Sequence, residues 1–376
     1  MMTVVVLILV LSFLVIIHEL GHLFAALWAK IKVEEFGIGY PPAARKLFTW
    51  KKIVFSLNWI PFGGFVRMAG EEANPDDTLA QKTGEFYQAS IFRRLVVVLA
   101  GATVNFIFGI IAFTITFSNI GIPTQLHDAR IGFVAENSPA EKSGLQVGYS
   151  LVGFKAADGT EVQTQTSAEV ISFVTAQRGQ TITAILQGPC DGKDCQNQIT
   201  EKSVYVRTQA ETPAGQGSLG VAFQDTILQF YPWWEMPVRS SYYGVTQALA
   251  LGGEILKALG GLVKNLVTTG AVPSELAGPV GIVHQAQSVG LVQEGFLAIL
   301  SFAGMLSINL AVMNVLPIPP LDGGKALFTV LEIVVKRKRL HKFEYWLNYG
   351  GYIFLMALIV LVTFRDVFRI FTRIIE

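Results

Sequence analysis

Long runs of apolar residues alternate along the chain with shorter, more polar segments. Four runs are long enough to cross the roughly 30 Å of hydrocarbon in a bilayer as α-helices. They cover residues 2–27, 95–117, 296–316 and 349–364. The pattern predicts a polytopic α-helical membrane protein with four transmembrane helices.

A cleaved signal peptide is the alternative interpretation of the first apolar run. Such peptides have a basic start, a short apolar centre and a small-residue cleavage site. Residues 2–27 have no basic start, form a longer apolar run and precede no such site. We therefore predict that this run is a retained transmembrane helix.

The hydrophobic pattern changes between residues 124 and 224, where apolar runs shorten and polar residues appear. Short alternating segments predict strands at 130–136, 145–154, 181–186 and 204–208. Ser138 followed by Pro139 predicts a helix start, Gly144 a helix stop, and residues 167–177 a second helix. Short strands with two helices predict one inserted α+β domain.

Two further segments do not fit the transmembrane pattern. Residues 54–66 combine β-branched and aromatic side chains with Gly63 and Gly64, which predicts a β-hairpin or re-entrant loop. Residues 242–266 form an amphipathic helical pattern that predicts an interfacial helix. The expected organisation is 1–123 (helices 1 and 2 with the hairpin loop), 124–224 (inserted domain), 225–294 (interfacial region) and 295–376 (helices 3 and 4).

The composition supports a membrane environment: 51% of residues are hydrophobic and only 15% are charged. In soluble domains about a quarter of all residues are charged. The lower charged fraction here indicates that lipid is part of the solvent. The net charge of +1 gives no reason to expect nucleic acid as a partner.

Lysine and arginine are concentrated in residues 30–94 and 325–342, the loops after the first and third apolar runs. The positive-inside rule predicts that both loops are cytoplasmic and that both termini and residues 124–224 lie outside. Arg365, Arg369 and Arg373 argue mildly against this orientation. Cys190 and Cys195 would form a disulfide in an oxidising compartment or remain two reduced thiols.

The first apolar run contains the sequence His18-Glu19-Leu20-Gly21-His22. Residues four apart lie on one face of a helix, so both imidazoles can bind one zinc ion while Glu19 accepts a proton from water. The alternative is a pair of histidines that only pack between helices. Ionisable groups inside a membrane cost several kcal/mol unless they are paired or metal-bound, so the metal site is favoured.

Catalytic zinc needs a third protein ligand and an open position. Asp322 is the best candidate because it follows the third apolar run in a proline-rich apolar segment. His18 lies about 24 Å along the first helix, so both ligand sets reach the same side of the bilayer. The alternative is a helix-capping aspartate. His127, His284 and His341 are weaker candidates.

Asn309 and Asn314 lie five residues apart in or just after the third apolar run. Buried amides at these positions would either join helices or bind the backbone of an unwound substrate. The sequence leaves these two interpretations open.

Together these motifs resemble the site-2 proteases, in particular the bacterial regulator-of-sigma-E subgroup. The resemblance rests on residues 18–22, on Asn-x4-Asn-x2-Pro-x-Pro-x-Leu-Asp-Gly at 309–323, and on Leu-Ala-Gly-Pro-Val-Gly-Ile at 276–282. Residues 131–148 are similar to a PDZ domain, for which 218–221 would be a closing strand. Tyr149 stands where such domains commonly have aspartate, and there is room for one PDZ domain where some relatives have two.

The resemblance implies an intramembrane zinc metalloendopeptidase with an extracytoplasmic PDZ insertion, located in the bacterial inner membrane. It implies Zn2+ held by His18, His22 and Asp322, with Glu19 as the catalytic base. It further implies substrate contacts at Asn309 and Asn314 and a membrane-dipping hairpin with Gly63 and Gly64, whose edge pairs with the substrate. The expected partners are membrane lipid and transmembrane protein substrates first cleaved by another protease.

Two other functional classes remain. A catalytically silent scaffold would use its PDZ domain to recruit partners, although such a protein would be expected to lack part of the metal set. A metal or proton-coupled transporter would also contain ionisable residues in its helices. Transporters are usually built from repeated halves, and no repeat is evident in this sequence.

Overall fold

The computed structural model describes residues 2–71, 84–126, 128–156, 159–188, 199–213, 215–269, 278–335 and 337–375. The chain divides into two compact units. One unit combines Met1–Asn119 with Trp233–Glu376, and the other is Ile120–Pro232. The second unit contains the predicted inserted domain and begins and ends a few residues outside it.

The first unit contains four helices that are long and apolar enough to span a membrane, as the sequence predicts. They are α1 (Met2–Trp28), α2 (Ile91–Ile120), α7 (Phe296–Val315) and the part Phe343–Arg365 of α9 (Arg337–Ile375). Large apolar side chains such as Leu9 and Phe13 on α1 are exposed. The chain is therefore an integral membrane protein.

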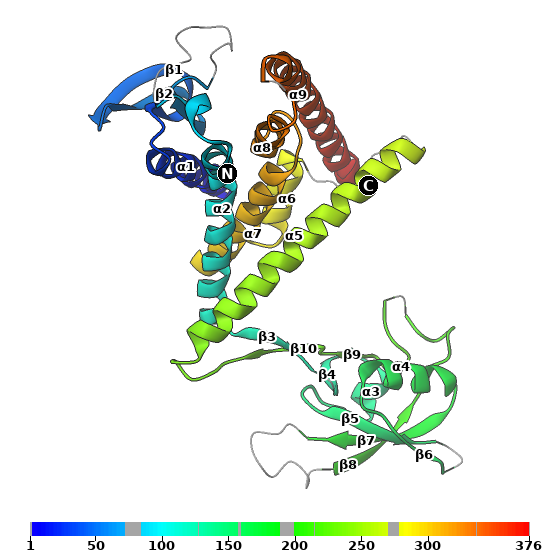
Figure 1. Ribbon diagram of the computed structural model, residues 1–376. Helices are drawn as coiled ribbons and strands as arrows, with labels where there is room; N and C mark the ends of the chain where they lie inside the picture. Colours follow the sequence, from blue (N-terminus) through cyan, green and yellow to red (C-terminus); the bar gives the residue numbers. More distant parts are fainter. Residues whose placement is uncertain are drawn as a thin grey trace. The chain divides into compact units, whose positions relative to one another are not determined.

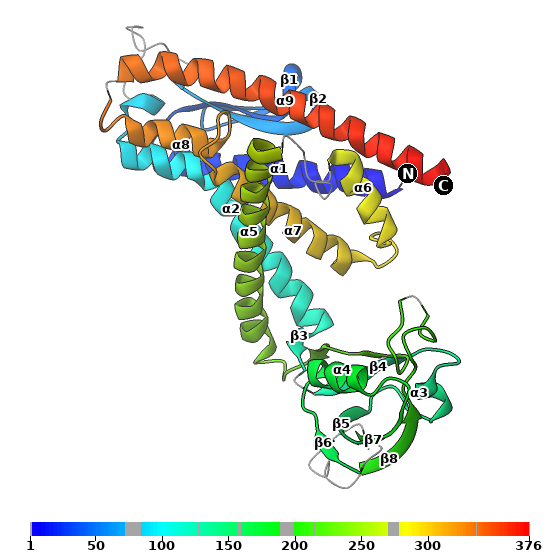
Figure 2. The same cartoon turned by 90° about the vertical axis from the view of Figure 1, so that its right-hand side faces the viewer.

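The described part of this unit also contains the α-helices α5 (Met236–Thr269), α6 (Pro279–Ser288) and α8 (Asp322–Leu331). Helix α5 is longer than the predicted 242–266. It packs closely against α2: a Cβ atom added to Gly244 of α5 would lie 3.0 Å from the Thr114 hydroxyl oxygen of α2. Its interfacial position stays a prediction. Figures 1 and 2 show α5 as one continuous helix and α8 as a short helix after α7.

The hairpin of the first unit is larger than predicted and turns at a different place. It pairs β1 (Val33–Trp50) with β2 (Ile53–Met68), and Trp50 lies opposite Ile53 across a turn at Lys51 and Lys52. Gly63 and Gly64 lie within β2, and Gly63 has a φ angle of 84°. The register is irregular, and Phe36 lies opposite both Val66 and Phe55. Both ends of β2 therefore contact the first part of β1.

The second unit is an α+β fold with a six-stranded sheet in the order β8-β7-β5-β4-β9, in which β6 pairs with β5. A separate ribbon pairs β3 with β10. The elements are β3 (Ile122–Gln125), β4 (Ala129–Val134), α3 (Pro139–Lys142), β5 (Ser150–Lys155), β6 (Glu161–Gln163), α4 (Ser167–Ala176), β7 (Thr181–Gln187), β8 (Ile199–Tyr205), β9 (Val221–Phe223) and β10 (Thr226–Gln229).

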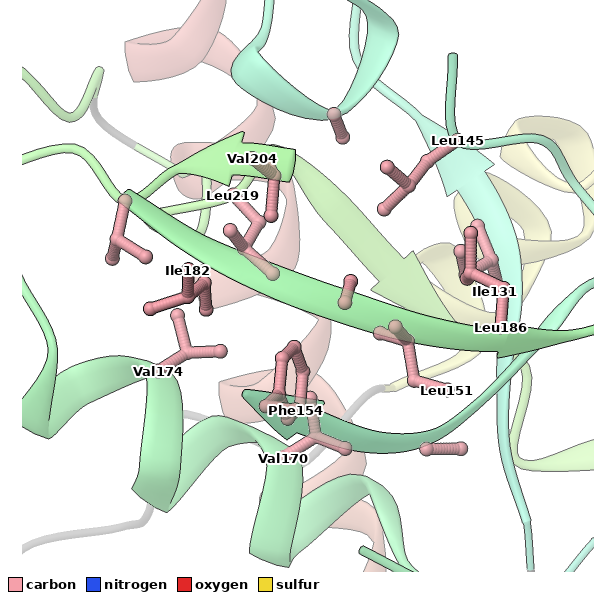
Figure 3. Packing of buried hydrophobic residues seen from close by; sticks show 14 residues of the cluster. Ile131, Leu145, Leu151, Phe154, Val170, Val174, Ile182, Leu186, Val204 and Leu219 are labelled. Carbon is pink, nitrogen blue, oxygen red and sulfur yellow. The ribbon is translucent and has the colours of Figure 1, made fainter. Parts of the chain in front are cut away.

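Helix α4 covers the hydrophobic core of the second unit. Figure 3 shows Val170 and Val174 of α4 beside Phe154 of β5 and Ile182 of β7, and all four are buried. Phe154 also stacks on Phe173, with ring centroids 4.9 Å apart. The unit thus has its own core.

Local sequence signals set the helix starts in this unit. The Ser138 hydroxyl accepts a hydrogen bond from the Glu141 backbone N–H, as the predicted helix start requires. Thr166 and Glu169 form a capping box at the start of α4. The predicted cysteine pair, Cys190 and Cys195, lies outside the described residues.

We predict that Phe154→Ala destabilises the second unit by about 3–5 kcal/mol, because it removes a fully buried ring and leaves a cavity. Urea unfolding of the fragment 120–232 measures this loss. Ile171→Ala on the exposed side of α4 is the matched control and should change stability by less than about 1 kcal/mol. Equal losses in the two variants would contradict the assigned core.

Candidate metal centre

Helix α1 places the two predicted imidazoles on adjacent turns of the same face. His18 and His22 are 9% and 7% exposed, and their Nε2 atoms are 3.1 Å apart. Their rings meet edge to face, with centroids 4.8 Å apart. The four-residue spacing thus directs both nitrogens to one point, as the sequence predicts.

Helix α8 brings Asp322 to the same point. Its Oδ2 lies 3.0 Å from His18 Nε2 and 3.2 Å from His22 Nε2. Gly323 allows the sharp return of the chain from α7, because a Cβ atom at this position would collide with the Leu316 carbonyl. Among the described residues, His18, His22 and Asp322 form the one cluster of three that could hold a metal ion.

The geometry of these three atoms fits a divalent cation. Ligands about 2.1 Å from a tetrahedral zinc ion lie roughly 3.4 Å apart, close to the separations seen here. Asp322 Oδ2 is buried, and no described residue donates a conventional hydrogen bond to it. Three converging lone pairs in an apolar environment repel one another unless a cation lies between them. Zinc suits two imidazoles and a carboxylate.

Helix α2 supplies no metal ligand but orients both histidines. His22 Nδ1 donates a hydrogen bond to the Val97 carbonyl oxygen at 2.8 Å, which leaves Nε2 free to bind metal. Asn105 is fully buried, and its side-chain amide lies 3.4 Å from His18 Nδ1. Within the described part of the chain, the Asn105 Oδ1 has no hydrogen-bond partner. Rotating the Asn105 side-chain amide by 180° would exchange its nitrogen and oxygen, so that Oδ1 could accept a hydrogen bond from His18 Nδ1–H.

Asn105 was not predicted from the sequence, although a signal for it was present. It is a strongly polar residue in the middle of an apolar run, and such residues usually have a functional partner. Val97 could not have been found, because it contributes only a backbone carbonyl.

Close helix contact makes these interactions possible. A Cβ atom on Gly101 of α2 would lie 2.7 Å from His18 Nε2 and 2.5 Å from His22 Nε2. A Cβ atom on Gly21 of α1 would lie 2.8 Å from the Ala100 carbonyl oxygen. Glycine at both positions lets the α2 backbone lie directly against the imidazoles.

Two ion pairs hold α8 in place. At its end, Arg94 of α2 donates to both carboxylate oxygens of Glu332, at 2.9 and 2.5 Å, and both side chains are almost fully buried. Near its start, Lys325 Nζ lies 2.7 Å from Glu71 Oε1. A two-pronged arginine–carboxylate pair is geometrically specific, so it restricts the helix that carries Asp322.

Glu19 is partly buried beside the ligand cluster and next to β2. A Cβ atom on Gly64 would lie 3.3 Å from Glu19 Cγ. Gly63 lies under the ring of Tyr40, where a Cβ atom would clash with it. The structure thus brings Gly64 to the predicted catalytic base.

Asn309 and Asn314 lie on α7, outside the ligand cluster. On the surface of this chain Asn309 is exposed and Asn314 partly buried. Of the other histidines, His284 is exposed on α6. His127 and the side chain of His341 lie outside the described part of the chain.

Comparisons with known proteins point to one family over nearly the whole chain. The model of "Peptidase family M50" matches residues 6–358. A relative from Clostridium acetobutylicum, named as a candidate zinc metalloprotease, is 30% identical over 369 residues, 97% of each chain. The zinc metalloprotease RasP of Bacillus licheniformis is 26% identical over 449 residues, which cover 99% of this chain and 100% of RasP.

The match includes both helices that carry the metal ligands and the segment that ends at Asp322. The ligand chemistry and the family agree on the metal and on the class of reaction. The chain therefore belongs to peptidase family M50, the site-2 protease family of zinc metalloendopeptidases of membranes.

Proposed function

We propose that this metalloprotease cuts other membrane proteins within or next to their transmembrane segments. The observation that carries the proposal is the position of the ligand cluster. His18 and His22 lie on α1 against α2, two helices with the apolar length of membrane spans, and Asp322 reaches them from the start of α8. A catalytic centre held by such helices is reached from the bilayer or its edge.

The residues divide the chemistry between them. His18, His22 and Asp322 would hold zinc, which polarises a carbonyl and lowers the pKa of a water to about 7. Glu19, beside the cluster, accepts the proton of the attacking water and passes it to the leaving amine. The Val97 carbonyl orients the imidazole of His22. The ion pair between Arg94 and Glu332 holds the helix that carries the Asp322 carboxylate.

The hairpin offers a way to bind an unwound substrate. A peptide bond in a transmembrane helix is protected by helical hydrogen bonds, and its exposed backbone groups are costly in lipid. Within the described ranges, residues 64–68 have register partners on β1 alone. Their outer edge begins at Gly64, beside Glu19, so a substrate strand that pairs with this edge would reach the base.

Asn309 and Asn314 would contribute to the same task from α7. The exposure of Asn309 favours contact with a substrate over contact between helices within this chain. An amide can both donate to and accept from an exposed backbone.

The second unit would act as a PDZ domain that limits access to the site. Its two helices, its six-stranded sheet and the pairing of β9 with β4 support this assignment. A domain of this size would exclude substrates with bulky outer segments and admit those first trimmed by another protease. The basic loops favour an orientation that places this unit outside the bacterial cytoplasmic membrane.

The decisive experiment replaces the base. We predict that Glu19→Gln lowers the rate of cleavage of a reconstituted single-span substrate by roughly 100-fold or more, because it removes proton transfer. Zinc content, measured by mass spectrometry, should stay at the wild-type level because Glu19 is not a ligand. Cleavage at the wild-type rate would favour a scaffold over a protease.

Asn105 provides a second test, which concerns metal binding. We predict that Asn105→Ala lowers zinc affinity by roughly 10–100-fold, the usual effect of losing a residue that orients a metal-binding histidine. Competition with a chelator measures this affinity. Asn119→Ala is the matched control, because Asn119 lies on the same helix, is exposed, and donates a hydrogen bond to the Ile115 carbonyl of its own helix. Equal zinc affinities of the two variants would contradict the role of Asn105.

The second unit, which is proposed to limit access to the site, can be deleted while the remaining chain stays continuous. Thr226 lies opposite Gln125 in the β3–β10 ribbon, so an Asn-Gly turn can replace residues 126–225. We predict that the shortened protein cleaves substrates that still carry their outer domain, whereas the full chain cuts only trimmed ones. If the shortened protein cuts trimmed substrates and still leaves intact ones uncut, the gate proposal fails.

A further inference from the structure

The tip of the β1–β2 hairpin concentrates positive charge. Residues 43–52, termed the basic tip, are all exposed and contain Arg45, Lys46, Lys51 and Lys52. No acidic residue lies between Glu35 and Glu71 in the sequence. Among the described residues, none of the four cations takes part in an ion pair.

The conformation of the turn indicates that its two lysines are not there to stabilise the fold. Lys51 and Lys52 form the two-residue connection and have φ angles of 47° and 71°. Such turns favour Asn-Gly, because other side chains are strained in the left-handed region. Folding alone would therefore favour other residues at both positions. The lysines are unfavourable for the turn but supply two adjacent cations at its end.

Apolar side chains accompany the cations. Leu47, Phe48 and Trp50 are 46%, 58% and 42% exposed. Phe48 stacks on Phe55 at 4.5 Å, which holds its ring in place, and Lys51 lies 4.8 Å from the centroid of the Trp50 ring. Aromatic rings next to lysines are typical of segments at the headgroup layer of a bilayer.

We propose that the basic tip docks on anionic phospholipid headgroups of the bilayer that holds the transmembrane helices. Insertion into hydrocarbon does not fit four cations that form no ion pair with the described residues. A merely solvated loop does not account for the exposed aromatic residues or the strained lysine turn. Attraction between the cations and an anionic lipid surface accounts for all three features.

Docking would fix the hairpin at a defined depth. The same two strands carry Gly64 against Glu19, so a tip held at the headgroups would set the level of the substrate-pairing edge. This consequence rests on the proposed function. The lipid contact does not, and the experiment therefore measures the contact directly and not cleavage.

The test uses the full chain in nanodiscs. With Cys190→Ser and Cys195→Ser, a polarity-sensitive fluorophore is attached at Thr49→Cys in the basic tip. Discs contain phosphatidylcholine alone or with phosphatidylglycerol, each with and without a spin-labelled lipid as quencher. We expect the fluorophore emission to shift to the blue, and to be strongly quenched by the spin-labelled lipid, only in discs that contain phosphatidylglycerol. Added salt should weaken both effects, because it screens the attraction between the cations and the lipid.

The charge-removing variant is Lys51→Asn with Lys52→Gly, which gives the turn its favoured residues and so preserves the hairpin. It should lower the apparent affinity of the tip for phosphatidylglycerol roughly 25-fold, about fivefold for each cation. Arg45→Gln with Lys46→Gln leaves the turn unchanged and should produce a similar loss. Lys142→Gln with Lys202→Gln removes equal charge from the second unit and should have no effect.

Two results would overturn the proposal. One is a wild-type signal that is the same with and without phosphatidylglycerol, which would mean a solvated or hydrocarbon-inserted tip. The other is a full phosphatidylglycerol response in both tip variants, which would mean that the cations do not make the contact.

Discussion

Three electron-rich side-chain atoms meet within a group of apolar helices, and the rest of the first unit is arranged around them. Two imidazole nitrogens and one carboxylate oxygen, all within 4.8 Å, would repel one another at low dielectric without a cation. Folding must hold them together against this repulsion. Helix α2 does so without contributing a ligand, because glycine at Gly101 lets its backbone lie against both rings.

The same helix connects the three ligands. His22 bonds to the Val97 carbonyl, His18 lies next to the Asn105 amide, and the helix of Asp322 is tied to α2 through Arg94 and Glu332. A shift of α2 would therefore disturb every ligand at once. This arrangement restricts the ligand geometry more tightly than the four-residue spacing of the histidines alone.

Catalysis also needs a substrate at the metal, and supplying it is the role proposed above for the hairpin. Its irregular register leaves the end of β2 with an edge that starts beside Glu19. Its other end carries four cations and exposed aromatic rings. One element could thus join the bilayer surface to the catalytic centre. The second unit has a separate core and could control access without altering the metal geometry.

The sequence alone determined the features that depend on local periodicity and composition. Apolar length predicted the four spans, helical spacing placed His18 and His22 on one face, and depth in the bilayer selected Asp322. The start of α3 at Ser138 followed from capping chemistry. Each of these depends on residues close together in the chain or on simple distances along a helix.

Only the tertiary structure decided the contacts that orient the site. Asn105 is 87 residues from His18, Val97 is 75 from His22, and Glu332 is 238 from Arg94. The hairpin also extends beyond the expected 54–66 and turns at Lys51–Lys52, because strand register depends on pairing across the sheet. Such contacts arise from packing between distant segments, which local sequence patterns do not specify.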